Sequence, residues 1–251
     1  RILAQWIGDI LEKKKHLDQL KALNTNKERI LSVLSHDLRN SLSSVIGFCQ
    51  VIKRHNMAVP KTLQLIDRIQ NAGNNAHQLL QEILTVQELE SSRTEQDFNT
   101  HSLNPLLESV LLSFAAQARE KNVQFNYTPL KQSPNLHLHQ VWFSRMVENL
   151  LSNALKFTPG TGSIDLDIQE EKLGFCLVVK DTGIGIPKDL QPLIFEKFSE
   201  ARRPGVRGEV STGMGMYIIE QIVRMHQGKI WFDSKENQGS CFYVFIPKKM
   251  D

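Results

Sequence analysis

The sequence predicts an α+β protein of two domains: an antiparallel helical hairpin, followed by an α/β sandwich in which helices cover a sheet. Three observations lead to this prediction. The first 90 residues carry three glycines and one proline and hold two apolar stripes at helical spacing. Residues 91–102 are polar and lack periodicity. After them, short stretches with a strand pattern mix with amphipathic helices, an order typical of helices packed on one face of a sheet.

Composition limits the classes of protein to consider. The 251 residues are 41% hydrophobic and 23% charged, as in ordinary soluble globular proteins. No apolar run reaches the roughly 18 residues that span a bilayer, so we expect no membrane contact by this sequence, which starts at Arg1 and reads as a fragment. The net charge of +3 is too small to indicate a nucleic-acid partner. Cys49, Cys176 and Cys241 are far apart, which favours a reducing compartment over disulfides or zinc.

Two long helices with a short connection are predicted over residues 26–92. Their apolar positions alternate at spacings of three and four, the pattern of helices in bundles and coiled coils. The first stripe is Leu31, Leu34, Leu38, Leu42, Val45, Cys49 and Ile52, and the second is Leu65, Ile69, Ala72, Ala76, Leu79, Ile83 and Val86. A turn ending at Pro60 joins them. Because a hairpin alone leaves much apolar surface exposed, we expect a homodimer in which two hairpins form a four-helix bundle.

The remaining boundaries follow from similar patterns. A coiled-coil helix is predicted to lead into the hairpin over residues 1–25, where apolar residues continue the same spacing. We place a linker at residues 93–102 and the second domain at residues 103–251.

The second domain is predicted to mix helices with strands. A helix capped by Asn104 and Pro105 runs to about Lys121 and leads to a strand over residues 123–127. The other elements are helices over 139–157 and 213–227, strands over 163–169 and 175–181, and a closing hairpin of strands over 229–235 and 239–247.

The first candidate for chemistry is His36, within SHDLRN. It stands two residues from both Leu34 and Leu38, so at about 100° per residue it lies opposite the apolar stripe and faces solvent. A neutral imidazole is a competent nucleophile, and the carboxylate of Asp37 is placed to orient the ring and take its proton. A surface histidine without a chemical role is the simpler alternative. A zinc site is disfavoured because Asn40, a poor zinc ligand, stands one helical turn further on.

A second candidate is the helix segment ENLLSNALKF. Asn149, Asn153 and Lys156 share one face of this helix, and its apolar residues occupy the other. Amide oxygens suit Mg²⁺, which binds few protein groups together with phosphates, and lysine suits phosphate as a point charge. A solvated polar face would explain the same pattern.

Two glycine-rich segments complete the set. In DTGIGIP, which starts at Asp181, the glycines permit close backbone approach to a ligand. In STGMGMYIIEQI, which starts at Ser211, glycines open a helix whose free N–H groups favour phosphate. Each segment alone is a weak signal, because tight turns and helix starts often carry glycine. Three such elements in one domain are hard to explain by chance.

Together these segments resemble the sensor histidine kinases of two-component signalling. SHDLRNSLSSVIGF resembles the phospho-acceptor H-box, ENLLSNALKFT the N-box, DTGIGIP the G1 box, IFEKF the F-box and STGMGMYII the G2 box. GSCFYVFIP is similar to the closing strand, with Ser240 where threonine is common. The boxes occur in the family's order and cover nearly the whole chain.

The resemblance implies roles for the matching residues of the H-box. His36 is phosphorylated on its ring and Asp37 is its acid/base partner. Asn40 helps to position water when a phosphorylated regulator is dephosphorylated. Ser41 stands where proline is frequent, and because proline would bend the helix, a straighter helix is expected.

For residues 103–251 the resemblance implies a catalytic ATP-binding domain, with ATP and Mg²⁺ as cofactors. Asn153 would coordinate Mg²⁺. The residues implied at the phosphates are Asn149, Lys156, Gly213 and Gly215, and those implied around the adenine are Asp181, Gly183 and Gly185, with Ser240 also placed at the nucleotide. Residues 199–212 would form a mobile lid, whose Arg202, Arg203 and Arg207 are candidates to neutralise charge on the transferred phosphoryl group.

The predicted function is an ATP-dependent protein histidine kinase. It would autophosphorylate His36, pass the phosphoryl group to an aspartate of a response-regulator receiver domain, and also dephosphorylate that regulator. We expect a cytoplasmic location, with a membrane anchor elsewhere in the sensor left open.

Two rival functions are weighed against the kinase. An ATPase of the same fold, as in the gyrase, heat-shock chaperone and mismatch-repair families, needs a carboxylate one helical turn before the metal-binding asparagine, where this chain has Asn149; Glu148 is one residue off. A non-catalytic scaffold would have lost His36, Asn153, Asp181 or the glycines, and all of them are present.

Overall fold

The computed structural model describes residue 38 and residues 40–52, 59–90, 97–199, 201–209 and 211–248. The chain divides into two compact units, residues 1–80 and 81–251. The predicted lead-in helix and the predicted pair His36 and Asp37 lie outside the described residues. No helix in the described ranges is long and apolar enough to cross a membrane.

The first unit contains the helices that the apolar stripes predict. Residues 40–52 are helical throughout, and α2 runs from Val59 to Glu90, with the part after residue 80 belonging to the second unit. The guanidinium of Arg68 on α2 lies 5.9 Å from the centre of the Phe48 ring, which ties the two helices together. Several apolar side chains of this unit are nevertheless exposed by 46–56%, namely Leu42, Ile46, Leu63 and Ile66. The described residues of this unit therefore present apolar side chains to solvent.

The second unit holds the layered domain. Its elements are β1 (Asn99–Ser102), α3 (Leu103–Glu120), β2 (Gln124–Tyr127), β3 (Asn135–Leu138), α4 (Gln140–Phe157), β4 (Ser163–Glu171), β5 (Gly174–Asp181), the 3-10 turn η2 (Gln191–Leu193), α5 (Gly215–Met225), β6 (Lys229–Lys235) and β7 (Gly239–Pro247). The helices and strands predicted over residues 123–247 are all present, with ends shifted by a few residues.

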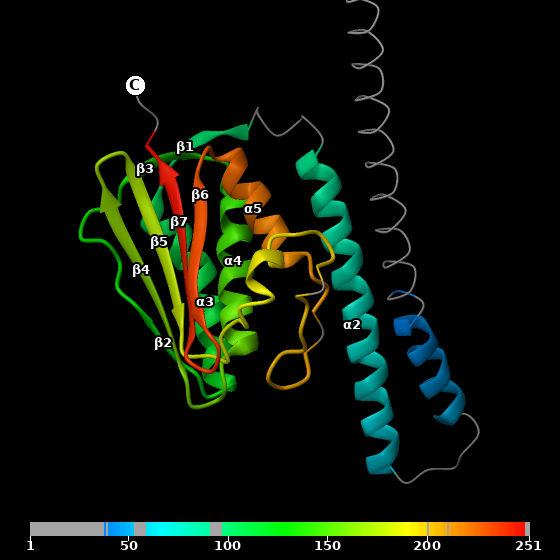
Figure 1. Ribbon diagram of the computed structural model, residues 1–251. Helices are drawn as coiled ribbons and strands as arrows, with labels where there is room; N and C mark the ends of the chain where they lie inside the picture. Colours follow the sequence, from blue (N-terminus) through cyan, green and yellow to red (C-terminus); the bar gives the residue numbers. More distant parts are fainter. Residues whose placement is uncertain are drawn as a thin grey trace, which may run out of the picture. The chain divides into compact units, whose positions relative to one another are not determined.

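A five-stranded sheet in the order β2-β4-β5-β7-β6 forms one layer of this domain. β2 pairs with β4 in parallel, and the other neighbours are antiparallel. Helices α3, α4 and α5 lie along one side of the sheet (Figure 1). The register sets Asp181 of β5 opposite Ser240 of β7. The carboxyl end of β5 is therefore held next to the start of the closing strand.

Apolar side chains between the sheet and the helices form the core. On α4 the buried residues recur at helical spacing, and they are Trp142, Phe143, Met146, Val147, Leu150, Leu151, Ala154 and Leu155. On α5 they are Ile218, Ile219, Ile222 and Val223. This burial fixes the rotation of α4, so Asn149, Asn153 and Lys156 lie on the half-exposed side.

The region between the two predicted domains differs from the sequence expectation. Residues 99–102, which we placed in the linker at 93–102, form β1 and pair antiparallel with β3, a strand that we did not predict. β1 has four polar residues and no hydrophobic alternation. β3 does alternate, with Leu136 and Leu138 buried, but over only four residues, the shortest run that indicates a strand. The capping prediction also needs correction: Ser102 is the N-cap of α3, and Asn104 lies in its first turn.

Candidate active site

Asp181, the last residue of β5, is buried with 6% of its surface exposed. Its Oδ1 accepts hydrogen bonds from the backbone N–H of Gly183, at 2.7 Å, and of Ser240, at 3.2 Å. Burial raises the pKa of this carboxyl to about 6, although the two backbone hydrogen bonds lower it. Asp181 is thus a fixed acceptor whose negative charge stays costly despite these two donors.

The loop after Asp181 is shaped by glycine. A Cβ on Gly183 would collide with the carbonyl of Phe157 and with the Asp181 carboxylate. Gly185 has φ +63°, and a Cβ there would run into the backbone of Lys235. The N–H of Ile184 donates to Phe157 O at 3.0 Å, which fastens the loop to the end of α4. Both predicted glycines are therefore required by close backbone packing.

Ser240 takes part in a small hydroxyl network beside this loop. Its Oγ lies 2.9 Å from Ser234 Oγ on β6. Ser234 Oγ also accepts from the N–H of Ile186, at 2.9 Å. The network links the DTGIGIP loop to the β6–β7 hairpin. Ser240 contributes its backbone N–H to Asp181 and its hydroxyl to Ser234, which in turn contacts the loop.

Asn153 of α4 lies next to the start of α5. Its Nδ2 is 3.3 Å from the sulfur of Met216, and an added Cβ on Gly215 would be 3.7 Å from Nδ2 and 3.9 Å from Oδ1. Gly215 is the first residue of α5, whose first turn offers free backbone N–H groups. An amide oxygen and a helix N-terminus are therefore side by side, a pairing that suits a metal ion together with phosphate.

Gly213 stands in the turn ahead of α5. Its φ is +78°, a conformation that favours glycine. An added Cβ would lie 3.5 Å from the Cα of Phe198 and from the amide nitrogen of Ser199. Phe198, the last residue of IFEKF, is itself buried with φ +51°. The F-box and the G2 box therefore meet at this point.

Lys156, near the end of α4, is half-buried. Burial lowers the pKa of its ammonium group, and the Glu209 carboxylate opposes that change. The nitrogen lies 5.7 Å from the centre of the Phe157 ring. A partly desolvated ammonium beside an aromatic ring is well prepared to receive an anion.

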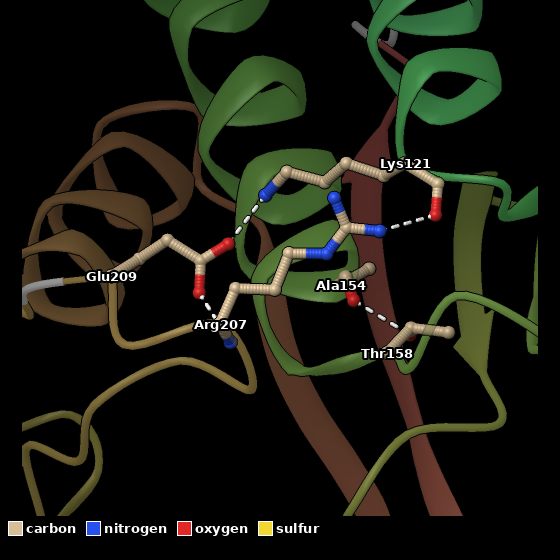
Figure 2. Close-up of polar contacts among 5 residues, drawn as sticks. All are labelled: Lys121, Ala154, Thr158, Arg207 and Glu209. Carbon is tan, nitrogen blue, oxygen red and sulfur yellow. Dashed lines mark hydrogen bonds and ion pairs between the residues drawn. The ribbon is translucent and has the colours of Figure 1, made fainter. Parts of the chain in front are cut away.

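The lid arginines have different surroundings. Arg203 donates from Nη2 to Gly185 O at 2.7 Å and lies 5.7 Å from the centre of the Phe157 ring. Arg207 instead donates from Nη2 to the carbonyl of Lys121 at 2.6 Å, as Figure 2 shows. Arg203 thus lies at the DTGIGIP loop and Arg207 at the end of α3.

The structure brings most of the predicted nucleotide residues into two adjoining groups. One group is Asp181, Gly183, Gly185 and Ser240, and the other is Asn153, Gly213 and Gly215. Helix α4 connects the two groups, because it carries Asn153 and ends at Phe157, whose carbonyl accepts from the N–H of Ile184 in the DTGIGIP loop. Asn149 lies half-exposed on the same face of α4. Asn40 is exposed on the helix of the first unit.

Some residues at the site were not selected from the sequence. Ser234 and Phe157 each contact a predicted residue, but both are common residue types in ordinary sequence surroundings. Lys121 and Glu209 form an ion pair across 88 positions of the chain, and no local pattern indicates such a pair.

Two protein families match the sequence. The family described as His Kinase A (phospho-acceptor) domain matches residues 26–92. The family described as histidine kinase-, DNA gyrase B- and HSP90-like ATPase matches residues 139–250.

Relatives match nearly all of the chain. The autoinducer 2 sensor kinase/phosphatase LuxQ of Vibrio vulnificus is 32% identical over 250 residues, which cover 94% of this chain and 28% of that protein. The circadian input-output histidine kinase CikA of Synechocystis is 30% identical over 251 residues, covering 96% and 34%. The adaptive-response sensory kinase SasA of Gloeothece citriformis is 28% identical over 256 residues, covering 98% and 64%. The chain therefore spans less than two thirds of the length of these relatives.

Solved structures share the fold. The nucleotide-free catalytic domain of the histidine kinase ThkA has a TM-score of 0.52 at 27% identity, over 61% of this chain and 97% of that chain. ThkA in complex with the response regulator protein TrrA has a TM-score of 0.70 at 24% identity, over 88% of this chain and 61% of that chain. The second comparison confirms the fold prediction of a helical region followed by an α/β sheet domain. With a phospho-acceptor domain ahead of an ATPase-type domain, this chain belongs to the sensor histidine kinase family of two-component systems.

Proposed function

We propose that this chain is an ATP-dependent protein histidine kinase, which phosphorylates His36 and passes the phosphoryl group to an aspartate of a response regulator. The observation that carries the proposal is the contact between Asn153 on α4 and Gly215 at the start of α5, with Asp181 held in the adjoining loop. This arrangement provides a metal ligand, a phosphate-binding helix start and a buried acceptor within one site.

ATP binding would use both groups of residues. The Asp181 carboxylate accepts a hydrogen bond from the adenine amino group, and this donor offsets the cost of its burial. Gly183 and Gly185 keep the backbone close to the base. At the other end, Lys156 and Asn149 contact the phosphates, and Gly213 and Gly215 leave room for them at the helix start.

The residues present also fit Mg²⁺. The amide nitrogen of Asn153 faces Met216, so its oxygen Oδ1 points away from the thioether and is available as a hard ligand. When bound, Mg²⁺ would neutralise charge on the phosphates. The chain's own part is to hold Asn153 with α4 and to fix the phosphates against α5.

The transfer step needs His36 to approach the γ-phosphate. A neutral ring nitrogen of His36 forms a bond to the γ-phosphorus as the bond to the bridging oxygen breaks, and ADP leaves. Asp37 accepts the proton that the ring releases. Because such transition states are loose, positioning and neutralisation of charge supply most of the acceleration.

Two partners follow from this proposal. A second copy of the chain would cover the exposed apolar residues of the hairpin and complete a four-helix bundle. A receiver domain would dock on that bundle near His36, and Asn40 would assist the reverse reaction, the dephosphorylation of the regulator. We place the domain in the cytoplasm, where ATP and reduced cysteines are found.

Transfer of labelled phosphate from ATP to the chain tests this proposal. The chain is incubated with Mg²⁺ and γ-labelled ATP and then treated with acid. We expect a label that is acid-labile and absent from the His36→Gln variant. An acid-stable label, or no label in a chain that still binds nucleotide, would refute the kinase activity.

Hydrolysis is the second candidate function, and the site argues against it. An ATPase needs a base at the position of Asn149, and an amide cannot accept a proton from water at neutral pH. Glu148 is exposed, whereas Asn149 is half-buried on the face that carries Asn153. Release of free phosphate at the rate of His36 labelling would favour the hydrolase.

A further inference from the structure

Residues 205–209 of the lid form a compact turn. The N–H of Gly205 donates to Glu209 O at 2.9 Å, and the N–H of Gly208 donates to Gly205 O at 2.9 Å. The carboxylate of Glu209 folds back and accepts from the N–H of Arg207 through Oε2, at 3.0 Å. This part of the lid therefore has a defined conformation set by its own backbone and by one acidic side chain.

Three contacts fasten this turn to the ends of α3 and α4. Glu209 Oε1 pairs with Lys121 Nζ at 2.5 Å. Arg207 donates to Lys121 O at 2.6 Å, and both contacts are drawn in Figure 2. The N–H of Val206 donates to Lys156 O at 3.0 Å. The lid is thus anchored beside the lysine that we assign to phosphate.

Glu209 lies close to Lys156 as well as to Lys121. Gly205 is buried between them, and a Cβ on it would collide both with Glu209 Oε2 and with the Cγ of Lys156. Glycine at this position therefore leaves the room that brings the carboxylate and the Lys156 stem together. Burial raises the pKa of Glu209, but the hydrogen bond from Lys121, the backbone N–H groups of Glu209 and Arg207 and the charge of Lys121 together bring it below its ordinary value.

We propose that the carboxylate of Glu209 competes with nucleotide phosphate for the same cations. In the nucleotide-free protein this carboxylate neutralises Lys121 and Lys156, and the arriving phosphates displace it and release residues 205–209 from α3. The inference rests on the proposed role of Lys156 in phosphate binding. It adds a competition between one carboxylate of the lid and the phosphates for the same cations.

The energetics favour such an exchange. The side chains of Lys121 and Glu209 are 28% and 29% exposed, and ion pairs this accessible are weak, so the contact opens at low cost. A nucleoside diphosphate carries more negative charge and more acceptor oxygens than one carboxylate. The carboxylate therefore orders the empty lid without blocking the site.

A purely structural strap would behave differently from a competitor. If the ion pair only held the lid in shape, its loss from either end would weaken nucleotide binding. If Glu209 competes with phosphate, removing its charge strengthens binding. Removing Lys121 instead takes away one of the two cations and leaves Lys156 as the remaining partner of Glu209, which weakens nucleotide binding. The sign of the Glu209 effect separates the two cases.

The test is isothermal titration calorimetry of the full chain with ADP and Mg²⁺. We expect Glu209→Gln to tighten ADP binding about fivefold and Lys121→Gln to weaken it by a similar factor. In the double variant, Lys121→Gln should lower the ADP affinity by a smaller factor, because the Glu209 carboxylate no longer competes with the phosphates. Adenosine, which has no phosphate, should bind all variants equally. The Glu209→Asp variant keeps the charge on a shorter stem and should lie between Glu209→Gln and the wild type.

Glu170→Gln is the matched control, since Glu170 pairs with Lys248 on the surface at 2.6 Å and its loss changes the net charge equally. It should leave ADP affinity unchanged. Weaker ADP binding by Glu209→Gln, in a variant whose unfolding temperature matches the wild type, would overturn the competition. Failure of the wild-type chain to bind ADP would overturn the proposed function itself, and this inference with it.

Discussion

The side chain of Asn153 on α4 lies against Gly215, the first residue of α5, with the site of a Gly215 Cβ 3.7 Å from Nδ2 and 3.9 Å from Oδ1. These residues come from segments that stand 62 positions apart in the printed sequence. The buried faces of α4 and α5 bring them together. The small size of glycine keeps the space beside the amide open for a ligand.

Filling that space should weaken nucleotide binding without harming the fold. A methyl group at Gly215 would stand at ordinary van der Waals distances, and alanine favours a helix more than glycine does. We expect Gly215→Ala to keep or raise the unfolding temperature and to lower the affinity for Mg-ADP about tenfold. Calorimetry and thermal unfolding of the same preparation measure both quantities. Unchanged ADP affinity would remove Gly215 from the phosphate site.

Gly185→Ala is the contrasting variant. With φ at +63° and the Lys235 backbone in contact, this glycine has no room for a side chain. Its substitution should lower the unfolding temperature as well as the affinity.

Replacing Asp181 with asparagine should raise the free energy of unfolding by an amount that depends on pH. Its folded pKa of about 6 lies above the ordinary value of 3.8, so the folded state binds more protons than the unfolded state between these values. Protonation thus contributes stability that is present at low pH and is lost as the pH rises through about 6. We expect Asp181→Asn to raise the free energy of unfolding by about 2–3 kcal/mol at pH 8 and by much less at pH 4.

The same variant should lose nucleotide binding, because an amide NH₂ facing the adenine amino group cannot accept its hydrogen bond. Asparagine keeps Oδ1 as the acceptor for the two backbone N–H groups, so the loop is preserved. Urea unfolding at both pH values, together with ADP titration, makes the test. A variant that is less stable than the wild type at pH 8 would contradict the buried-charge explanation.

The site was predictable to the extent that its residues lie in short motifs. Asp181, Gly183 and Gly185 follow a strand with a clear hydrophobic pattern, and Asn153 lies on a strongly amphipathic helix. Burial of the apolar positions fixes where such residues point. The sequence therefore predicted these residues, and the structure brings them into adjoining groups.

The remainder depends on contacts between distant segments. β1 is held by its pairing with β3 and carries no apolar alternation of its own, and the alternation of β3 spans only four residues. The ion pair of Lys121 and Glu209 joins a helix end to the lid, and charged residues at such places are usually solvated. The different surroundings of Arg203 and Arg207 are likewise a result of the lid conformation, which no periodicity determines.

His226 makes the second domain sensitive to acid. Its Nδ1 lies 2.7 Å from Ile222 O and its Nε2 accepts from the N–H of His139, the N-cap residue of α4, at 3.1 Å. The ring is therefore neutral, with its proton on Nδ1. Burial lowers its pKa, and the neighbouring His139 adds to this, while the Ile222 carbonyl opposes it.

Because the folded pKa is lowered, the folded state binds fewer protons than the unfolded state, whose histidine has a pKa of about 6.5. The stabilisation is complete above that value and decreases as the pH falls below it. We expect His226→Gln to be less stable than the wild type at pH 7.5, with a flatter loss of stability between pH 6.5 and 5. Equal slopes for the two proteins, measured by urea unfolding, would show that His226 does not titrate in this window.

Asn40 should separate the two activities that we propose for the hairpin. The residue is exposed on the helix over residues 40–52, and its carbonyl accepts from Ser44 Oγ at 2.9 Å. Its side chain is therefore presented at the surface, while its backbone is held by the helix. Alanine favours a helix more than asparagine does, so Asn40→Ala should preserve the hairpin.

We expect Asn40→Ala to label His36 at the wild-type rate and to slow dephosphorylation of the regulator at least about tenfold, since a positioned water is lost. Ser44→Ala is the control, because it removes only the hydroxyl that contacts the Asn40 carbonyl. Autophosphorylation is followed with γ-labelled ATP, and dephosphorylation with a regulator that was phosphorylated beforehand. Equal losses in both reactions would mean that Asn40 supports the fold near His36, because an effect on water alone leaves the forward transfer intact.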